Sequence, residues 1–244
     1  MLKKACIFLF IMISINIFSI EFARSRSISS RFIIGTGICY NLKVSTNYYY
    51  QQDILPLSIP LKFAFDTRFT DWFSLYTGVD FIYQIRTFNN TINNEQVTFY
   101  NNSFMIDLPL IFKFYPMASK FDIYENFYIG LGLFPHFWVV NNVYFELNDE
   151  KFTLNVYDTE NRYLPPKKIY TPVNAGFYLS IGNHFTISDN VLLGIELFSD
   201  YLFVPVLNGY YVTPHIVNED DAVQLDFYIK FGLSMSFAFD LSRR

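Results

Sequence analysis

Apolar and polar residues alternate along most of this chain, in eight segments separated by polar stretches. The last segment is the clearest: its odd positions carry Val, Leu, Phe, Ile and Met, whereas its even positions include Gln224, Asp226, Lys230 and Ser234. A period of two residues is that of a β-strand whose two faces meet different surroundings. Each segment is long enough to cross a bilayer as a tilted strand. The eight segments are 32–44, 59–69, 73–85, 104–114, 127–139, 173–181, 191–203 and 223–239.

The connections between these segments alternate in length. Residues 70–72 and 188–190 form short turns and 116–121 a modest link, whereas 45–57, 89–98, 140–170 and 207–221 are longer and polar. Short turns on one rim and long loops on the other are typical of outer-membrane barrels. We therefore predict an all-β, antiparallel up-and-down transmembrane β-barrel of about eight strands, with short periplasmic turns and long extracellular loops.

The longest loop contains two brief alternating pieces, 143–147 and 152–156, around Asn148-Asp149-Glu150. Each is too short to span a bilayer, so we expect an extracellular hairpin at 143–157. If both pieces cross the membrane instead, the barrel has ten strands.

Composition indicates which face of the strands is outside. Aromatic residues make up 20% of the chain and charged residues 16%. The apolar face carries mainly large side chains, which is more volume than the interior of an eight-strand barrel holds. The opposite face combines Gly, Ser, Ala and Asn with charges, which suits a narrow lumen. We expect the apolar face to meet lipid; a soluble barrel with that face inside is the alternative. No stretch after the N-terminus is long and apolar enough for a membrane-spanning helix.

The N-terminus has the pattern of a secretory signal. Lys3 and Lys4 precede an apolar stretch at 5–18, and we expect cleavage between residues 19 and 27. The predicted organisation is a signal peptide at 1–23 and a barrel domain at 24–244, with a retained anchor as the alternative. Removal of the signal leaves Cys39 as the only cysteine, so no intramolecular disulfide is expected. A net charge of −4 without a basic run argues against nucleic-acid binding.

Several segments resemble a known family. "DLPLIFKFYP" at 107–116, "FYIGLGLFP" at 127–135 and the final "FYIKFGLSMSFAF" at 227–239 resemble the small outer-membrane β-barrel proteins, the OmpA/OmpX-like group of the porin superfamily. The resemblance covers nearly all of the mature chain, in pattern rather than in an invariant motif. It implies a place in the bacterial outer membrane, contact with its lipid and insertion by the barrel-assembly machinery. The chain departs from the family by continuing past Phe239 to "DLSRR", which displaces the terminal aromatic insertion signal.

The alternation also predicts which charges face the lumen. Acidic and basic residues there are nearly balanced, and charges in a confined interior are stabilised by pairing. We therefore expect a charge-paired, closed lumen and a structural or surface-interaction role; a narrow porin-like or OmpW-like channel for small solutes is the alternative. The predicted network consists of Lys62, Asp66, Arg68, Asp80, Arg86, Asp107, Lys113, Glu196, Asp200, Asp226 and Lys230, with Lys43 and Asp240 at its ends.

Catalytic and metal-binding patterns are not found in the sequence. His136, His184 and His215 are the only histidines, and none stands in a recognisable pattern with a nucleophile and an acid. Because Cys and His occur singly, we expect no metal and no other cofactor. An enzyme is not expected, and a lipid-modifying barrel is a remote alternative. The Tyr- and Asn-rich loops, such as "NYYYQQD" at 47–53, are candidates for contact with an extracellular ligand or host surface.

Overall fold

The computed structural model describes residues 29–45, 52–53, 56–92, 95–116, 126–147, 150–154, 173–203, 207–210 and 223–241. The predicted signal peptide and its cleavage site lie outside these residues. Every element that the structure describes is a β-strand. In the described part of the chain, no helix has the length and apolarity needed to cross a membrane.

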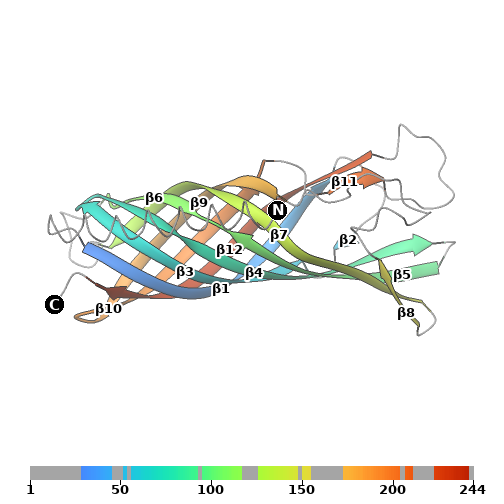
Figure 1. The fold of residues 1–244 in the computed structure, drawn as a ribbon, viewed down its shortest axis with the longest axis horizontal. Coiled ribbons are helices and arrows are strands. Elements are labelled where there is room, and N and C mark those ends of the chain that lie inside the picture. The colour runs from blue at the N-terminus through green and yellow to red at the C-terminus, as the bar shows by residue number, and fades with distance from the viewer. Residues whose placement is uncertain are drawn as a thin grey trace.

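The main strands form one closed antiparallel ring (Figure 1). Going round the ring, each strand pairs with the next, and β12 pairs with β1 from Arg31–Asp240 to Ser45–Asp226. Closure leaves no free sheet edge along the paired part of the wall. This confirms the predicted up-and-down barrel, with β5 and β6 together forming one position in a ring of eight. The ring strands are β1 (Ser29–Ser45), β3 (Leu57–Thr70), β4 (Phe73–Ile92), β5 (Glu95–Asp107), β6 (Leu110–Phe114), β7 (Phe127–Leu147), β9 (Val173–Ser188), β10 (Val191–Leu202) and β12 (Val223–Asp240).

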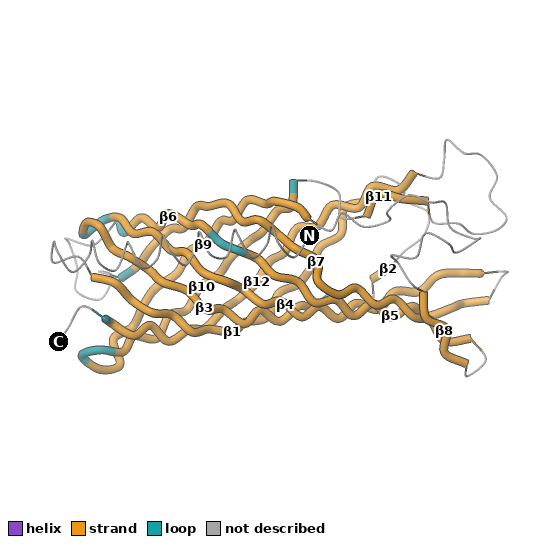
Figure 2. Tube along the Cα trace, in the orientation of Figure 1, coloured by secondary structure: helices purple, strands orange, loops and turns teal. Residues whose placement is uncertain are grey.

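The two shortest predicted turns are observed, and both lie at the same end of the barrel. The chain turns from β3 to β4 at residues 71–72 and from β9 to β10 at 189–190. Figure 2 shows these turns at the end that also holds the last described residues. We call this the turn end of the barrel.

Beyond the other end of the ring, the wall continues as paired strands. We predicted a loop at 89–98, but residues 89–92 and 95–98 are strand, and the β4–β5 ladder runs on from Phe88–Phe99 to Ile92–Glu95. Two strands that leave the ring side by side continue to satisfy each other's backbone hydrogen bonds, which explains this extension. β8 (Glu150–Leu154) pairs with the last residues of β7, where the sequence analysis expects a hairpin. The shorter strands β2 (Gln52–Asp53) and β11 (Leu207–Tyr210) pair with β4 and β12.

Exposure alternates along the ring strands as the sequence pattern predicts. The outward residues Leu197, Met235 and Ile181 are at least half exposed, whereas the inward residues His136 and Ala238 are fully buried. An apolar exterior around an interior with many polar residues is the reverse of a soluble barrel. It is the architecture of a small outer-membrane β-barrel.

One residue assignment in the fourth segment was wrong. We placed Leu108 on the outward face of a single strand over 104–114, but the strand is interrupted at Leu108–Pro109 and Leu108 is buried. Pro109 has no N–H with which to continue the ladder. The wall is closed here by a bond outside the regular ladder, in which the Leu108 N–H donates to the Pro135 carbonyl oxygen at 3.0 Å.

Candidate functional site in the barrel lumen

Most of the charged residues predicted for the lumen lie buried inside the ring. Arg68 lies half-buried at the turn end, where its guanidinium donates to the backbone oxygens of Thr70 and Asp71 and lies over the Tyr115 ring. The side chains of Arg86 and Asp226 lie outside the described part of the structure, as does that of Lys43. The buried members of the predicted network are Lys62, Asp66, Asp80, Asp107, Lys113, Glu196, Asp200 and Lys230; Arg31, which we did not predict, is buried as well.

Ion pairs join strands on different sides of the lumen. The Lys230 Nζ on β12 lies 3.3 Å from the Asp107 Oδ2 on β5. These strands are four positions apart in either direction round the ring, so this pair spans the barrel diameter. Lys62 on β3 pairs with Glu196 on β10 at 3.0 Å, and Lys113 on β6 pairs with Asp66 on β3 at 3.3 Å. The walls are therefore connected by charge-assisted bonds through the interior.

Glu196 is the most highly bonded of these acids. Besides Lys62, its carboxylate accepts from the Tyr178 hydroxyl at 2.5 Å, the Tyr128 hydroxyl at 2.8 Å and Ser234 Oγ at 3.4 Å. These donors come from four strands, β3, β7, β9 and β12. A buried carboxylate needs such partners, because burial without them costs several kcal/mol.

Asp107 is the centre of a second group. Its Oδ1 lies against His136 Nδ1, whereas its Oδ2 accepts from Lys230. Lys230 also lies 3.7 Å from the Asp200 Oδ2. The His136 ring in turn meets Trp138 edge to face, with centroids 5.4 Å apart. The predicted charges that the sequence places on separate strands are thus brought together in the fold.

Large aromatic side chains fill much of the remaining lumen, which our sequence analysis did not predict. Three of their rings lie over inward glycines: an added Cβ would meet the Phe134 ring from Gly176 and the Phe198 ring from Gly232 at 2.3 and 2.4 Å, and the Tyr128 ring from Gly182 at 2.5 Å. The sequence does contain a signal for these rings, because all occupy inward positions of the alternation and inward glycines leave space for a neighbouring ring. The buried inward aromatics include Tyr76, Tyr115, Tyr128, Phe134, Trp138, Tyr178 and Phe198.

These rings also contact the lysines. The Lys62 Nζ lies 4.3 Å from the centre of the Phe198 ring, and the Lys113 Nζ lies 4.2 Å from that of Tyr128. The negative face of an aromatic ring attracts a cation, most strongly where water is excluded. Each ammonium is therefore held by a carboxylate and by rings.

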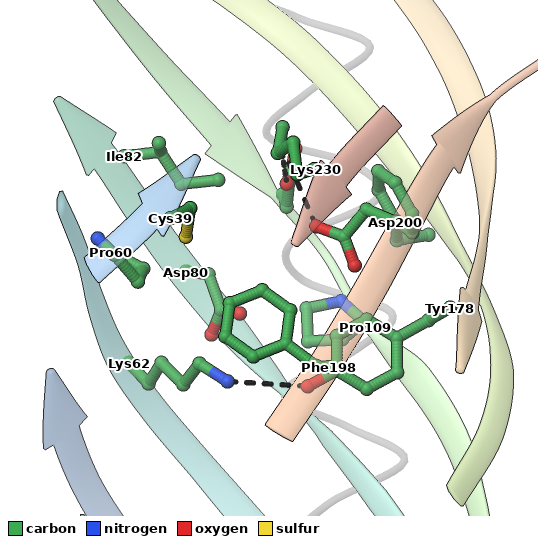
Figure 3. Close-up of a pocket in the computed structure, with 12 residues that line it drawn as sticks. Cys39, Pro60, Lys62, Asp80, Ile82, Pro109, Tyr178, Phe198, Asp200 and Lys230 are labelled. Carbon is green, nitrogen blue, oxygen red and sulfur yellow. Dashed lines mark hydrogen bonds and ion pairs between the residues drawn. The ribbon is translucent and has the colours of Figure 1, made fainter. Parts of the chain in front are cut away.

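A small cavity remains between the charged groups near the middle of the lumen (Figure 3). Asp80, Asp107 and Asp200 line it together with Lys62 and Lys230. Its other lining residues are Cys39, Pro60, Ile82, Pro109, Phe134, Tyr178 and Phe198.

No set of three or more His, Cys, Asp and Glu side chains that suits a metal ion occurs among the described residues. His136 and His184 are buried on different parts of the wall, and His184 stacks on Tyr128 with centroids 5.2 Å apart. His215 lies outside the described residues.

Comparison with known proteins gives likeness in structure alone. No family model matches the chain, and no curated protein matches it. The outer membrane protein OprG from Pseudomonas aeruginosa is similar at a TM-score of 0.43 and 11% identity, over 88% of this chain and 97% of that chain. Neisserial surface protein A is similar at a TM-score of 0.33 and 11% identity, over 85% of this chain and 96% of that chain. The attachment invasion locus protein Ail of Yersinia pestis is similar at a TM-score of 0.34 and 11% identity, over 87% and 99%.

Proposed function

We propose that this chain is an integral outer-membrane β-barrel whose lumen is closed by paired charges and aromatic rings, and that it has a structural or surface-interaction role. The observation that supports this most directly is the Lys230–Asp107 pair across the barrel diameter. The Lys62–Glu196 pair crosses the lumen between β3 and β10.

A solute that passed through this interior would have to separate these pairs. Removing one partner of a buried ion pair costs about 3–5 kcal/mol, because the other charge is left uncompensated. The rings of Phe134 and Phe198 occupy the space beside the pairs, and both are buried. The interior of an eight-strand barrel is only wide enough for its own side chains.

The exterior supports a membrane location. At the turn end, Trp72 stacks on Phe114 with centroids 6.5 Å apart, and Phe73 stacks on Phe112 at 5.9 Å. Aromatic side chains are enriched where a membrane meets water. We infer that this cluster lies at the periplasmic interface and that the longer strand ends face outside the cell.

Planar-bilayer recording tests the closed lumen. Purified wild-type protein is expected to give no stable, discrete openings. The double variant F134A/F198A, which removes two lumen rings without changing any charge, is expected to give them. Unchanged heat-modifiable migration on a denaturing gel shows that the variant is folded. Discrete openings from the wild-type protein would establish the channel alternative instead.

Protease treatment of intact cells tests the orientation. Trypsin is expected to cleave the segment between residues 148 and 168, which contains Lys151, Arg162, Lys167 and Lys168. The link at residues 116–121, which contains Lys120 and lies at the opposite rim in the proposed orientation, is expected to be protected until the outer membrane is opened. Protection of the 148–168 segment in intact cells, with cleavage at the opposite end, would reverse the proposed orientation.

A further inference from the structure

The groups around the central cavity carry more negative than positive formal charge. Lys62 and Lys230 are the cations that line it, and the carboxylates bonded to them or lining it with them are Asp80, Asp107, Asp200 and Glu196. If all six were ionised, this group would carry two uncompensated negative charges in a buried site. Such a charge is costly, so buried carboxyl groups commonly bind a proton instead.

The hydrogen bonds and ion pairs show which carboxyl group lacks a cationic partner. Glu196 accepts from four donors, and Asp107 accepts from Lys230 and lies against His136. Asp200 has Lys230 at 3.7 Å. Asp80 takes part in none of the ion pairs among the described side chains.

The surroundings of Asp80 disfavour its charged form. In the strand register, Asp80 lies opposite Asp107 on β5 and opposite Lys62 on β3. The Lys62 ammonium donates instead to Glu196, Tyr178 and Ser234. Asp80 is 7% exposed and its Oδ1 has no hydrogen-bond partner. A buried carboxyl beside another carboxyl, with its nearest cation engaged elsewhere, is stabilised by protonation.

The cavity contains a second carboxyl oxygen without a partner. The Asp200 Oδ1 also has no hydrogen-bond partner, Asp200 is 5% exposed, and both carboxyl groups line the same cavity (Figure 3). A protonated carboxyl donates one hydrogen bond, whereas an ionised one only accepts. A proton on Asp80 therefore gives the cavity a donor, which two carboxylates lack.

We propose that Asp80 is a proton-binding site, which takes one proton from water when the barrel folds and holds it towards the cavity. Removing that proton adds an uncompensated negative charge to the buried site and lowers the stability of the barrel. This goes beyond the proposed closed lumen and holds whether or not the barrel conducts. The titratable groups that line the cavity are Cys39 on β1, Lys62 on β3, Asp80 on β4, Asp107 on β5, Tyr178 on β9, Asp200 on β10 and Lys230 on β12. His136 on β7 and Glu196 on β10 bond to members of this set, and Tyr128 on β7 bonds to Glu196. Tyr76 is buried on the same face of β4 as Asp80.

Denaturant unfolding of the full chain in detergent micelles, from about pH 5 to about pH 9, tests the proposal. The folded state binds a proton that the unfolded state has released in this range, so wild-type stability is expected to fall as the pH rises. D80N carries no ionisable group at this position and is expected to lose that slope. The ratio of wild-type to D80N unfolding constants should then rise by up to about tenfold per pH unit.

D200N is the matched control, because it removes the carboxylate on the other side of the cavity and leaves Asp80 in place. It is expected to retain a slope that D80N loses. If D80N retains the wild-type slope, or if D200N alone removes it, Asp80 is not the proton-binding site. Replacing sodium in the buffer by a large organic cation is expected to change nothing; a strong effect would mean that a metal cation, not a proton, neutralises the site.

Infrared spectroscopy gives a readout that does not depend on unfolding. The folded wild-type barrel is expected to show the C=O band of one buried protonated carboxyl group at neutral pH, and D80N is expected to lack it. The absence of the band in the wild-type protein, or its persistence in D80N, would overturn the proposal.

Discussion

E196L is expected to lower the free energy of unfolding by about 3–5 kcal/mol, the cost of leaving a buried charge without its partner. Glu196 is the ion-pair partner of Lys62, and both side chains are nearly inaccessible to water. The substitution also leaves the Tyr128 and Tyr178 hydroxyls without the acceptor that they share. We expect the loss as a lower denaturant midpoint of the barrel in vesicles or micelles.

The double variant K62M/E196L is the matched control. Met replaces the lysine stem against the Phe198 ring, and neither member of the Lys62–Glu196 pair is left without its partner. Replacing a buried ion pair by apolar side chains is often neutral or stabilising, so the double variant is expected to be more stable than E196L alone. If E196L is as stable as the wild-type protein, the Lys62–Glu196 pair does not support the fold. If the two variants are equally unstable, the loss comes from the tyrosines or from packing.

The ring could be predicted from the sequence because lipid and lumen impose opposite demands on alternate residues. Residues 229–239 of β12 alternate between exposed apolar and less exposed positions as the pattern indicates. The short turns at 71–72 and 189–190 mark where the chain reverses direction with only two residues between the strands. Period and turn length are local properties, and both could therefore be obtained from one chain.

The irregular parts of the wall depend on contacts that local patterns do not contain. The alternation continues through Leu108, but the break at Pro109 turns this leucine inward, and its N–H finds an acceptor on β7. The extension of β4 and β5 over 89–98 likewise depends on the two strands leaving the ring together. The Asn residues there suggested a loop, and pairing between the strands outweighed their low strand propensity.

The alternation of odd and even positions predicted which charges face inward, but not which of them form pairs. Whether Lys230 meets Asp107 or another acid depends on the stagger between strands that are four positions apart in the ring. That stagger accumulates over every strand pair and has no local signature. The lumen aromatics were not predicted, although large rings such as Phe134 and Tyr178 occupy the same inward positions of the alternation as the polar residues.

L197R is expected to destabilise the barrel by about 2–4 kcal/mol in a lipid bilayer, whereas I187R is expected to cost about 0–1 kcal/mol. Leu197 lies near the middle of β10 and is 63% exposed; Ile187 lies beside the turn at 189–190 and is 57% exposed. The two positions thus differ mainly in depth, because a charge near the midplane of a bilayer loses its hydration and one near the interface keeps it. The measurement is the free energy of unfolding of each variant in vesicles.

The pair of variants separates a membrane barrel from a soluble one. On a soluble protein, both positions are open to water, and an arginine at either costs little. A depth-dependent cost requires that the exposed apolar face meets hydrocarbon. Equal and small effects at Leu197 and Ile187 would contradict the membrane location on which the proposed function rests, even with the ring and its buried charges intact. A large cost at Leu197 alone would show that lipid, rather than a protein partner or water, is the medium for which this exterior is built.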